Sequence, residues 1–168
     1  NLRTLSGSVV TIGNFDGMHL GHLQLINRVV EEAKQRALPS VLITFEPQPN
    51  EFFSPKKQAR LMRFREKWLA LENLGIDYVC CLRFTPAFSA LSAEDFVHDI
   101  LYKRMGMKAI IVGDDFRFGA KRQGDFAMLR RLGQHLNFES KAMSTLLLDN
   151  KRVSSTRVRQ ALYNGQLN

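Results

Sequence analysis

The chain has 168 residues, of which 45% are apolar and 24% charged, and it carries a formal net charge of +8. This is a globular composition whose length suits one domain, and apolar runs of about four to six residues exclude a membrane span. The N-terminal sequence lacks the pattern of a secretory signal peptide. The spread positive charge favours a polyanionic partner, without separating a nucleic-acid binder from a nucleotide enzyme. Adjacent Cys80 and Cys81 indicate buried free thiols in a reducing cytosol.

Short β-prone runs alternate with amphipathic stretches along the chain. The expected strands are 9–12, 40–45, 78–84 and 108–112, with further β-prone stretches at 138–142 and 145–148. The expected helices are 19–36, 63–74, 92–104, 125–135 and a last one from Ser154 to Gly165. Three of the five prolines lie in segment 46–61, which predicts a loop and a candidate mobile flap. The alternation predicts a Rossmann-like α/β three-layer sandwich with a parallel sheet and ligands beyond the carboxyl ends of the strands.

The segment GNFDGMHLGHLQ (13–24) follows the first expected strand and opens the first helix. Gly13 permits a turn away from the sheet, and Gly21 leaves room for an anion close to the backbone. A helix that begins near His19 directs unpaired N–H groups into that space, which suits a phosphate. His19 and His22 share one helical face and would address the same group. Zinc would need a third ligand that the neighbouring sequence does not supply, and two ordinary surface or core histidines are the other alternative.

A second helix start of this kind lies in VSSTRVRQAL (153–162). Ser154 or Ser155 caps the helix, and Thr156 adds a hydroxyl group. Three arginines surround its positive end: Arg152, Arg157 and Arg159. Alone, the segment is typical of a well-capped, solvated helix. Together with the first helix start, it predicts that two helix N-termini hold a triphosphate.

The segment VGDDFRFG (112–119) places carboxylates and aromatic rings after an expected strand. Asp114 and Asp115 suit a hydrogen bond to a ribose or a role in Mg²⁺ coordination. Phe116, with Arg117 beside it, suits a site for a flat ring. A turn with a hydrophobic anchor is the alternative interpretation.

The segment TFEPQPNEFF (44–53) combines a stiff backbone with exposed rings. Pro47 and Pro49 restrict the loop. Three phenylalanines offer flat apolar surface: Phe45, Phe52 and Phe53. Binding of an aromatic ligand and simple plugging of the core are equally compatible with this pattern.

These segments, in this order, resemble the FMN adenylyltransferase module of bacterial bifunctional FAD synthetases, within the nucleotidylyltransferase superfamily. The family pattern is TxGxFDGxHxGH, FEPxP, RLxxxxEK, VGxDFRFGxxxxGD and SSTRxRxAL. This chain has TIGNFDGMHLGH, FEPQP, RLMRFREK, VGDDFRFGAKRQGD and SSTRVRQAL. Gln48 departs from the pattern, because many members have histidine there. A β-rich riboflavin kinase module does not follow the last expected helix, so we expect one adenylyltransferase domain over residues 1–168 and no flavokinase activity.

The resemblance implies transfer of AMP from ATP to FMN, giving FAD and pyrophosphate, with Mg²⁺ accompanying ATP in the cytoplasm. The phosphate of FMN would be the nucleophile, since a second pKa near ~6 leaves it mostly dianionic at neutral pH. No side-chain nucleophile is then required, and positioning and electrostatics carry the reaction. Neither nucleic acid nor a membrane is an expected partner.

The resemblance also implies roles for individual residues. Catalytic roles fall to His19, His22, Asp115 and Arg157. ATP binding falls to Gly13, Asn14, Phe15, Gly21, Gly113, Arg152, Ser155, Thr156 and Arg159. Flavin binding falls to Phe45, Pro47, Gln48, Phe116 and Arg117. Asp115 would fix the flavin phosphate or a metal-linked water, and no protein ligand of Mg²⁺ is assigned.

Three rival hypotheses stay open at this point. Another transferase with the HxGH motif would act on NMN, pantetheine phosphate or a choline-like phosphate. A nucleic-acid-binding module would lose affinity steeply with salt, although its basic residues form no single stripe with interleaved aromatic rings. A flavin-storage protein would bind FAD without ATP-dependent turnover.

Overall fold

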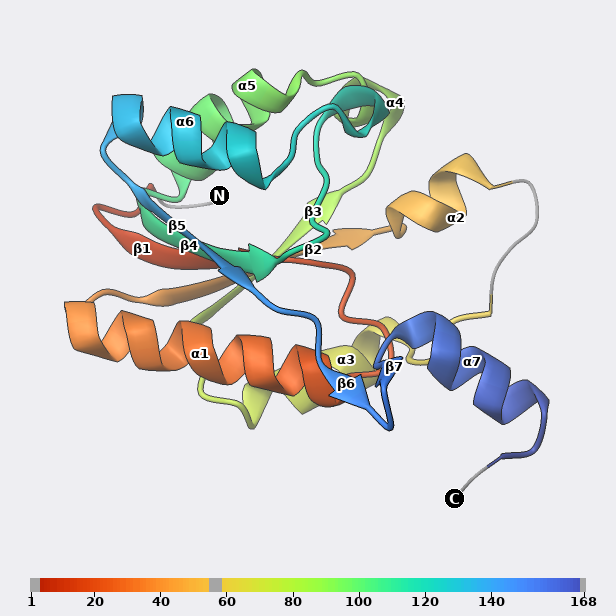
Figure 1. Ribbon diagram of the computed structural model, residues 1–168. Helices are drawn as coiled ribbons and strands as arrows, with labels where there is room; N and C mark the ends of the chain where they lie inside the picture. Colours follow the sequence, from red (N-terminus) through yellow and green to blue (C-terminus); the bar gives the residue numbers. More distant parts are fainter. Residues whose placement is uncertain (1–3, 55–58, 167–168) are drawn as a thin grey trace.

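A sheet of five parallel strands forms the centre of the computed structural model, which describes residues 4–54 and 59–166 (Figure 1). The strands are β1 (Ser8–Ile12), β2 (Ser40–Glu46), β3 (Tyr78–Arg83), β4 (Met107–Gly113) and β5 (Glu139–Met143). Their order across the sheet is β3-β2-β1-β4-β5, with Thr11 opposite Leu42 and Val10 opposite Ile110. β2 and β3 are therefore added on one side of β1, and β4 and β5 on its other side. In α/β sheets, ligands bind at the point between two such strands, here β1 and β4, where the strand order changes direction.

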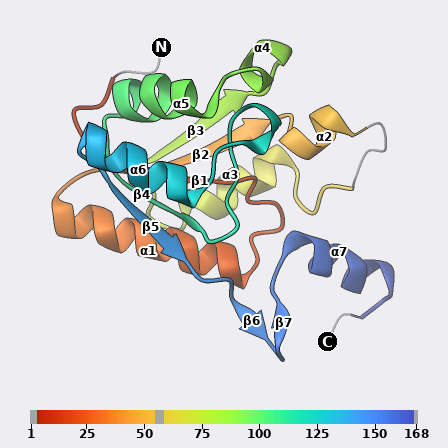
Figure 2. The same ribbon diagram turned by 45° about the horizontal axis from the view of Figure 1, so that its top comes forward.

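Helices cover both faces of the sheet (Figures 1 and 2). One face is covered by α1 (Leu20–Arg36) and α3 (Phe64–Glu72). The other face is covered by α5 (Ala93–Asp95), the helix η1 (Phe96–Arg104) and α6 (Phe126–Leu136). Ile26 and Leu71 pack in the first layer, and Leu101 and Leu129 in the second, all of them buried. The predicted three-layer α/β sandwich is confirmed.

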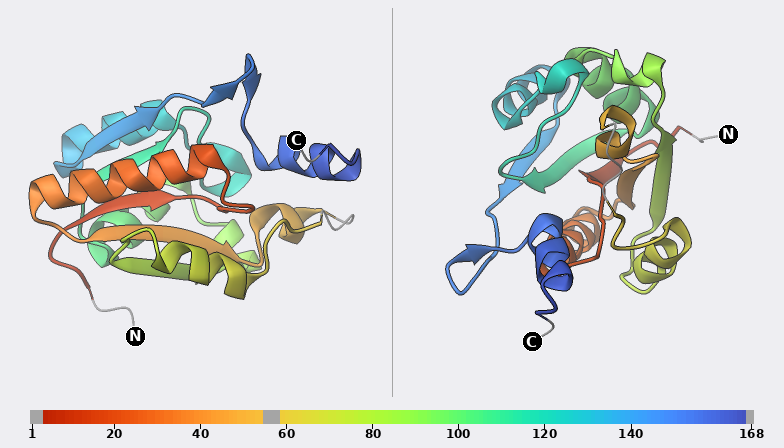
Figure 3. Two further views of the ribbon diagram at one scale, coloured as in Figure 1. Left: turned by 90° about the horizontal axis from the view of Figure 1, so that it is seen from below. Right: turned by 90° about the vertical axis from the view of Figure 1, so that its right-hand side faces the viewer.

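The shorter elements gather at the edge to which the strands point (Figures 1 and 3). They are α2 (Pro49–Phe53), α4 (Pro86–Ser89), the 3₁₀ turn η2 (Ala120–Arg122), the hairpin β6 (Leu147–Leu148) and β7 (Lys151–Arg152), and α7 (Ser155–Tyr163). Asp149 and Asn150 form the hairpin turn with positive φ angles of 52° and 56°. This edge carries most of the segments in which the sequence places functional residues.

Two elements differ from the sequence-based expectation. Part of the predicted loop 46–61 is helix α2, because Pro49 stands at its first turn and the Gln48 N–H donates to Glu51 Oε2 at 3.0 Å. Residues 55–58 of the expected flap lie outside the described residues. The expected α-helix over 92–104 is a short α5 followed by a π-helix, in which the i→i+5 spacing places Phe96 and Leu101 on one buried line.

The two cysteines also differ from each other. Cys80 is buried and Cys81 is exposed, so the expectation of two buried thiols is wrong for Cys81. The reason is that β3 is an edge strand, whose successive side chains point to opposite faces. Within the described part of the chain, no helix is long and apolar enough to cross a bilayer.

Candidate active site

The loop between β1 and α1 has an unusual backbone. Phe15 and Met18 adopt positive φ angles of 47° and 38°, a region that side-chain-bearing residues visit rarely. Phe15 is fully buried, and its ring packs 5.2 Å from the ring of His22. His19 caps α1, since the His22 N–H donates to His19 Nδ1 at 3.3 Å. Packing and capping together hold the start of α1 in place.

His19 and His22 form a stacked pair at this helix start. Their ring centroids lie 3.6 Å apart and the planes differ by 16°. Burial lowers the pKa of His22 to about 3, with smaller contributions from His19 and Lys67, and burial also lowers the pKa of His19. Both rings are therefore neutral at pH 7 in the ligand-free protein. Because His19 Nδ1 accepts a hydrogen bond, its proton belongs on Nε2, which makes that atom a donor.

Asp16 is a buried carboxylate that ties three segments together. Only 2% of it is exposed. It accepts hydrogen bonds from the N–H groups of Leu61 and Met62, both at 3.0 Å, and it pairs with the guanidinium of Arg159 on α7. The Ser155 hydroxyl donates to the Asp16 carbonyl oxygen at 2.7 Å. The start of α7 is thereby fixed against the loop that opens α1.

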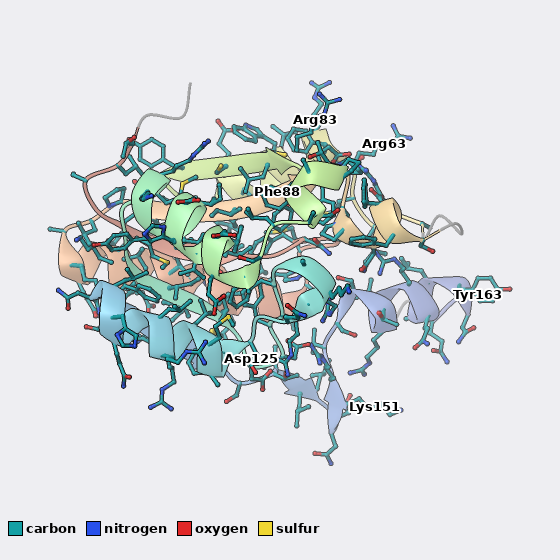
Figure 4. The ribbon with its side chains drawn as sticks, turned by 90° about the horizontal axis from the view of Figure 1, so that it is seen from above. Arg63, Arg83, Phe88, Asp125, Lys151 and Tyr163 are labelled. Atoms are coloured by element: carbon teal, nitrogen blue, oxygen red, sulfur yellow. The ribbon has the colours of Figure 1, made fainter. Side chains whose placement is uncertain are left out.

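The second helix start has the expected cap. The Ser154 hydroxyl accepts from the Arg157 N–H at 3.2 Å, and α7 continues to Tyr163, which lies at its far end (Figure 4). Ser155 and Thr156, at the near end, line a cavity together with His19. The two helix starts, far apart in the sequence, therefore open into the same space.

This space is a polar cavity of about 400 Å³ beside the β1–β4 reversal. It is bounded by the loops after β1 and β4, the hairpin and the first turns of α1 and α7. The sequence-predicted residues that line it are Gly13, Asn14, Phe15, His19, Gly21, His22, Gln48, Gly113, Asp115, Phe116, Arg152, Ser155, Thr156 and Arg159. All nine residues expected to bind ATP are among them.

A second, aromatic cavity of about 830 Å³ adjoins the polar one. Its rings come from β2, α2, the end of β3, α4, the start of η1 and the loop after β4: Phe45, Phe53, Phe84, Phe88, Phe96, Phe116 and Phe118. Phe88, labelled in Figure 4, packs with ring centroids 5.8 Å from Phe45 and 5.5 Å from Phe84. The residues common to both cavities include Asn14, Asp115 and Phe116. A ligand with a flat ring at one end and phosphates at the other fits across this boundary.

The two aspartates after β4 have different partners. Asp114 accepts from the Thr145 hydroxyl at 2.8 Å and from the Thr145 N–H at 3.1 Å, and the hydroxyl is the main cause of its lowered pKa. Asp115 pairs with Arg152 of β7 at the mouth of the cavity. Among the described residues, no three His, Cys, Asp or Glu side chains group as a metal site. Asp115 is thus the carboxylate of the two that borders both cavities.

Three expected site residues lie elsewhere than expected. Arg157 does not line either cavity, and its guanidinium donates to the carbonyls of Leu148 and Lys151 at 3.1 and 3.0 Å, across the hairpin. Its catalytic role stays a prediction that this placement does not support. Gln48 lines the polar cavity and not the aromatic one, and Pro47 lines neither. Arg117 and Phe45, in contrast, do line the aromatic cavity.

Four further residues, which no sequence pattern predicted, shape the site. Asp16 and Lys67 stand in the motifs FDG and RLMRFREK, so their signal was present, but their partners are distant in the sequence. Phe84 directly follows β3 and Phe88 lies on α4, beyond a strand end where ligands were expected, yet no pattern singled them out.

Comparison with known proteins agrees with this geometry. A family model described as FAD synthetase matches residues 2–157. The chain belongs to the FAD synthetase family. It is 48% identical over 162 residues to the bifunctional riboflavin kinase/FMN adenylyltransferase of Escherichia coli K12, covering 96% of this chain and 52% of that protein. The corresponding protein of Haemophilus influenzae is 40% identical over 166 residues, with coverages of 98% and 54%. The chain spans about half the length of the curated relatives it matches.

Solved structures support the same fold. The crystal structure of a protein named as a macrolide-efflux protein from Streptococcus pneumoniae superposes with a TM-score of 0.86 at 28% identity, covering 99% of this chain and 55% of that one. A pantothenate synthetase from Thermus thermophilus gives a TM-score of 0.53 at 21% identity, with coverages of 93% and 62%. The second likeness concerns the fold alone.

Proposed function

We propose that this chain transfers the AMP group of ATP to FMN, forming FAD and releasing pyrophosphate. The observation that carries the proposal is the pair of adjoining cavities, one polar at two helix starts and one aromatic, which share Asn14, Asp115 and Phe116 at their boundary. Family membership supports the same activity.

The polar cavity suits the phosphates of ATP. An oxygen of the FMN phosphate attacks the α-phosphorus of ATP, the bond to the bridging α–β oxygen breaks, and that oxygen leaves with pyrophosphate. His19 and His22, neutral in the free protein, donate hydrogen bonds as negative charge grows on the leaving oxygens. Ser155 and Thr156 bind the β- and γ-phosphates at the start of α7. The protein contributes position and charge rather than a nucleophile.

Mg²⁺ is the expected companion of ATP, and this site fits a metal that enters bound to phosphate oxygens. All three carboxylates have partners, since Asp16 pairs with Arg159, Asp114 accepts from Thr145 and Asp115 pairs with Arg152. Asp115 is the one that borders both cavities, so it is the carboxylate that would hold a metal-linked water between the two substrates. When bound, Mg²⁺ would neutralise charge on the polyphosphate. The residues of the chain orient that polyphosphate by themselves.

The aromatic cavity suits the isoalloxazine ring of FMN. Phe45, Phe88 and Phe116 present ring faces and edges around it, and Arg117 adds a cation at its rim. A flat acceptor of this kind favours FMN over NMN, pantetheine phosphate or a choline-like phosphate. The proposed place of action is the cytoplasm, where the thiols of Cys80 and Cys81 stay reduced.

The experiment incubates the purified protein with ATP, Mg²⁺ and one acceptor at a time: FMN, riboflavin, NMN or phosphopantetheine. Chromatography then identifies the products. We expect FAD and pyrophosphate with FMN, and no adenylyl transfer to riboflavin, which lacks the phosphate that acts as nucleophile. Turnover of NMN or phosphopantetheine instead of FMN would contradict the proposal. Tight FAD binding without turnover would indicate flavin storage, and salt-sensitive binding of mixed-sequence DNA without turnover would indicate a nucleic-acid module.

A further inference from the structure

The loop between β4 and α6 contains a tight turn whose backbone does not suit its residues. Phe118 and Gly124 exchange two backbone hydrogen bonds, at 3.1 and 2.9 Å, and so close the chain between them. At the tip of this turn, Lys121 and Arg122 have positive φ angles of 53° and 58°. Turns with two successive positive φ angles strongly favour asparagine, aspartate and glycine. A lysine and an arginine at these positions are strained, and this strain calls for an explanation.

The same molecule contains a turn of this kind with suitable residues. Asp149 and Asn150, at the tip of the hairpin formed by β6 and β7, have φ angles of 52° and 56°. Neither of them lines the polar or the aromatic cavity. Lys121 and Arg122, in contrast, both line the aromatic cavity. The residues that do not suit their backbone are therefore those that border the proposed flavin site, and strain of this kind is typical of ligand sites.

The cations of this turn have no anionic partner. Over residues 4–54 and 59–166, no ion pair includes Lys121 or Arg122. Arg117, which also lines the aromatic cavity, donates to the carbonyl oxygen of its neighbour Phe116 at 3.0 Å. Among the described residues that line this cavity, the one acid is Asp115, and it stands at the boundary with the polar cavity. The rest of the rim therefore carries positive charge without a compensating carboxylate.

This distribution of charge distinguishes the two edges of a flavin ring. The pyrimidine edge of isoalloxazine carries two carbonyl oxygens, which accept hydrogen bonds, whereas its dimethylbenzene edge is apolar. Phenylalanine rings such as Phe45 and Phe88 suit the apolar edge, and cationic donors suit the carbonyl oxygens. The ribityl chain leaves from the middle ring, so either orientation of the ring lets the phosphate reach the boundary at Asp115. The rim of the cavity must therefore select the orientation.

We propose that Arg122, with Lys121 beside it, orients the flavin by donating hydrogen bonds to the carbonyl oxygens of its pyrimidine edge. The inference rests on the proposed function and adds the residue that recognises one edge of the ring. A guanidinium offers several N–H donors in one plane, which suits the planar carbonyl edge. The dimethylbenzene edge then lies among the phenylalanine rings. The positive φ angles place the two cations at the rim, which explains why the strained backbone is retained.

The test uses Arg122→Gly, which removes the guanidinium and also suits a positive φ angle. Fluorescence titration measures Kd for FMN, and calorimetry measures Kd for phenazine, a flat three-ring compound without carbonyl groups. We expect Kd for FMN to rise about tenfold, as for the loss of a hydrogen bond to a charged group, and Kd for phenazine to stay within about twofold of wild type. The melting temperature of the ligand-free variant should equal or exceed that of wild type, because glycine relieves the strain.

A titration of the bound flavin tests the orientation itself. A cation beside the pyrimidine edge stabilises the anion that forms when N3 of the flavin loses its proton, and an arginine stays charged at the alkaline pH required. Absorption spectra should therefore show that the N3 pKa of bound FMN is about one unit higher in Arg122→Gly than in wild type. Arg122→Lys, which retains the positive charge, should restore most of the affinity for FMN.

Asn150→Gly is the matched control, because it relieves the same backbone conformation at the hairpin turn and removes no side chain from either cavity. It should change neither Kd nor the N3 pKa of bound FMN. An unchanged Kd for FMN in Arg122→Gly, equal weakening of FMN and phenazine, or an unshifted N3 pKa would overturn the inference. Failure of wild type to make FAD would instead contradict the proposed function, which keeps the two results apart.

Discussion

The two cavities are built by different forces. The polar cavity depends on hydrogen bonds between segments that are far apart in the sequence, with Asp16 joining α7 and the 59–62 segment to the loop after β1. The aromatic cavity depends on phenylalanine rings that pack edge to face, such as Phe84 against Phe88. A hydrogen bond fails when one partner is lost, whereas a packed ring tolerates replacement by another apolar side chain. A single substitution at the polar cavity should therefore abolish most of the activity, whereas an apolar substitution at the aromatic cavity should reduce it only moderately.

The largest expected effect comes from Asp16→Asn. The substitution leaves the guanidinium of Arg159 without its anion, and breaking a buried pair of this kind costs about 3–5 kcal/mol. It also releases the start of α7 from the loop that opens α1, so kcat should fall more than about 10²-fold. Denaturant unfolding and steady-state kinetics measure the two effects. Asp77→Asn is the matched control, since Asp77 accepts from the Ser40 N–H at 2.8 Å at the opposite edge of the sheet.

The control separates stability from catalysis. Asp77→Asn should lower the free energy of unfolding while the folded fraction keeps its kcat. If Asp16→Asn behaved in the same way, with normal kcat in the folded fraction, the idea that Asp16 aligns the two helix starts would be wrong.

The next effect is that of His22→Asn. The substitution removes a ring that stacks 3.6 Å from His19, and with it one of the two proposed donors to the phosphates of ATP. Loss of one preorganised donor lowers kcat about 10²-fold, and Kd for FMN should stay within about twofold of wild type. Single-turnover kinetics and flavin fluorescence measure these quantities. The control is His98→Asn, at an exposed position on η1, which should behave like wild type. An unaltered single-turnover rate in His22→Asn would show that the His22 ring has no role in the reaction.

At the aromatic cavity, Phe88→Leu should raise KM for FMN about tenfold and leave KM for ATP nearly unchanged. The ring of Phe88 contacts those of Phe45, Phe84 and Phe96, and each aromatic pair contributes on the order of 1 kcal/mol beyond burial. Phe64→Leu, in an exposed pair with Trp68 on α3, is the control and should change neither KM. Equal changes in both KM values for Phe88→Leu would show that the two cavities do not act separately.

Local signals explain what could be predicted from the sequence. The glycines and the i, i+3 histidines after β1 form one short motif, and the serine cap of α7 lies in another. Each motif can be recognised within a few residues, and the structure brings the two to one cavity. Asp16 and Lys67 were missed because their partners stand 45 to 143 residues away, so no spacing reveals them. Gln48 was expected at the flavin together with Phe45 of the same motif, yet at the start of α2 it lines the polar cavity.

The smallest effect should come from substitution of Arg157, whose partners could likewise not be predicted from the sequence. Three arginines surround the start of α7, and the sequence offers no means of ranking them, but the structure turns Arg157 to the hairpin carbonyls and leaves Arg152 on the cavity wall. Arg157→Ala should change KM for ATP less than about twofold and cost less than about 1 kcal/mol of stability, the value of exposed hydrogen bonds. Arg152→Ala, its matched partner, should raise KM for ATP about tenfold. Equal increases in the two variants would mean that Arg157 leaves the hairpin and binds ATP, which would restore the role that the sequence assigned to it.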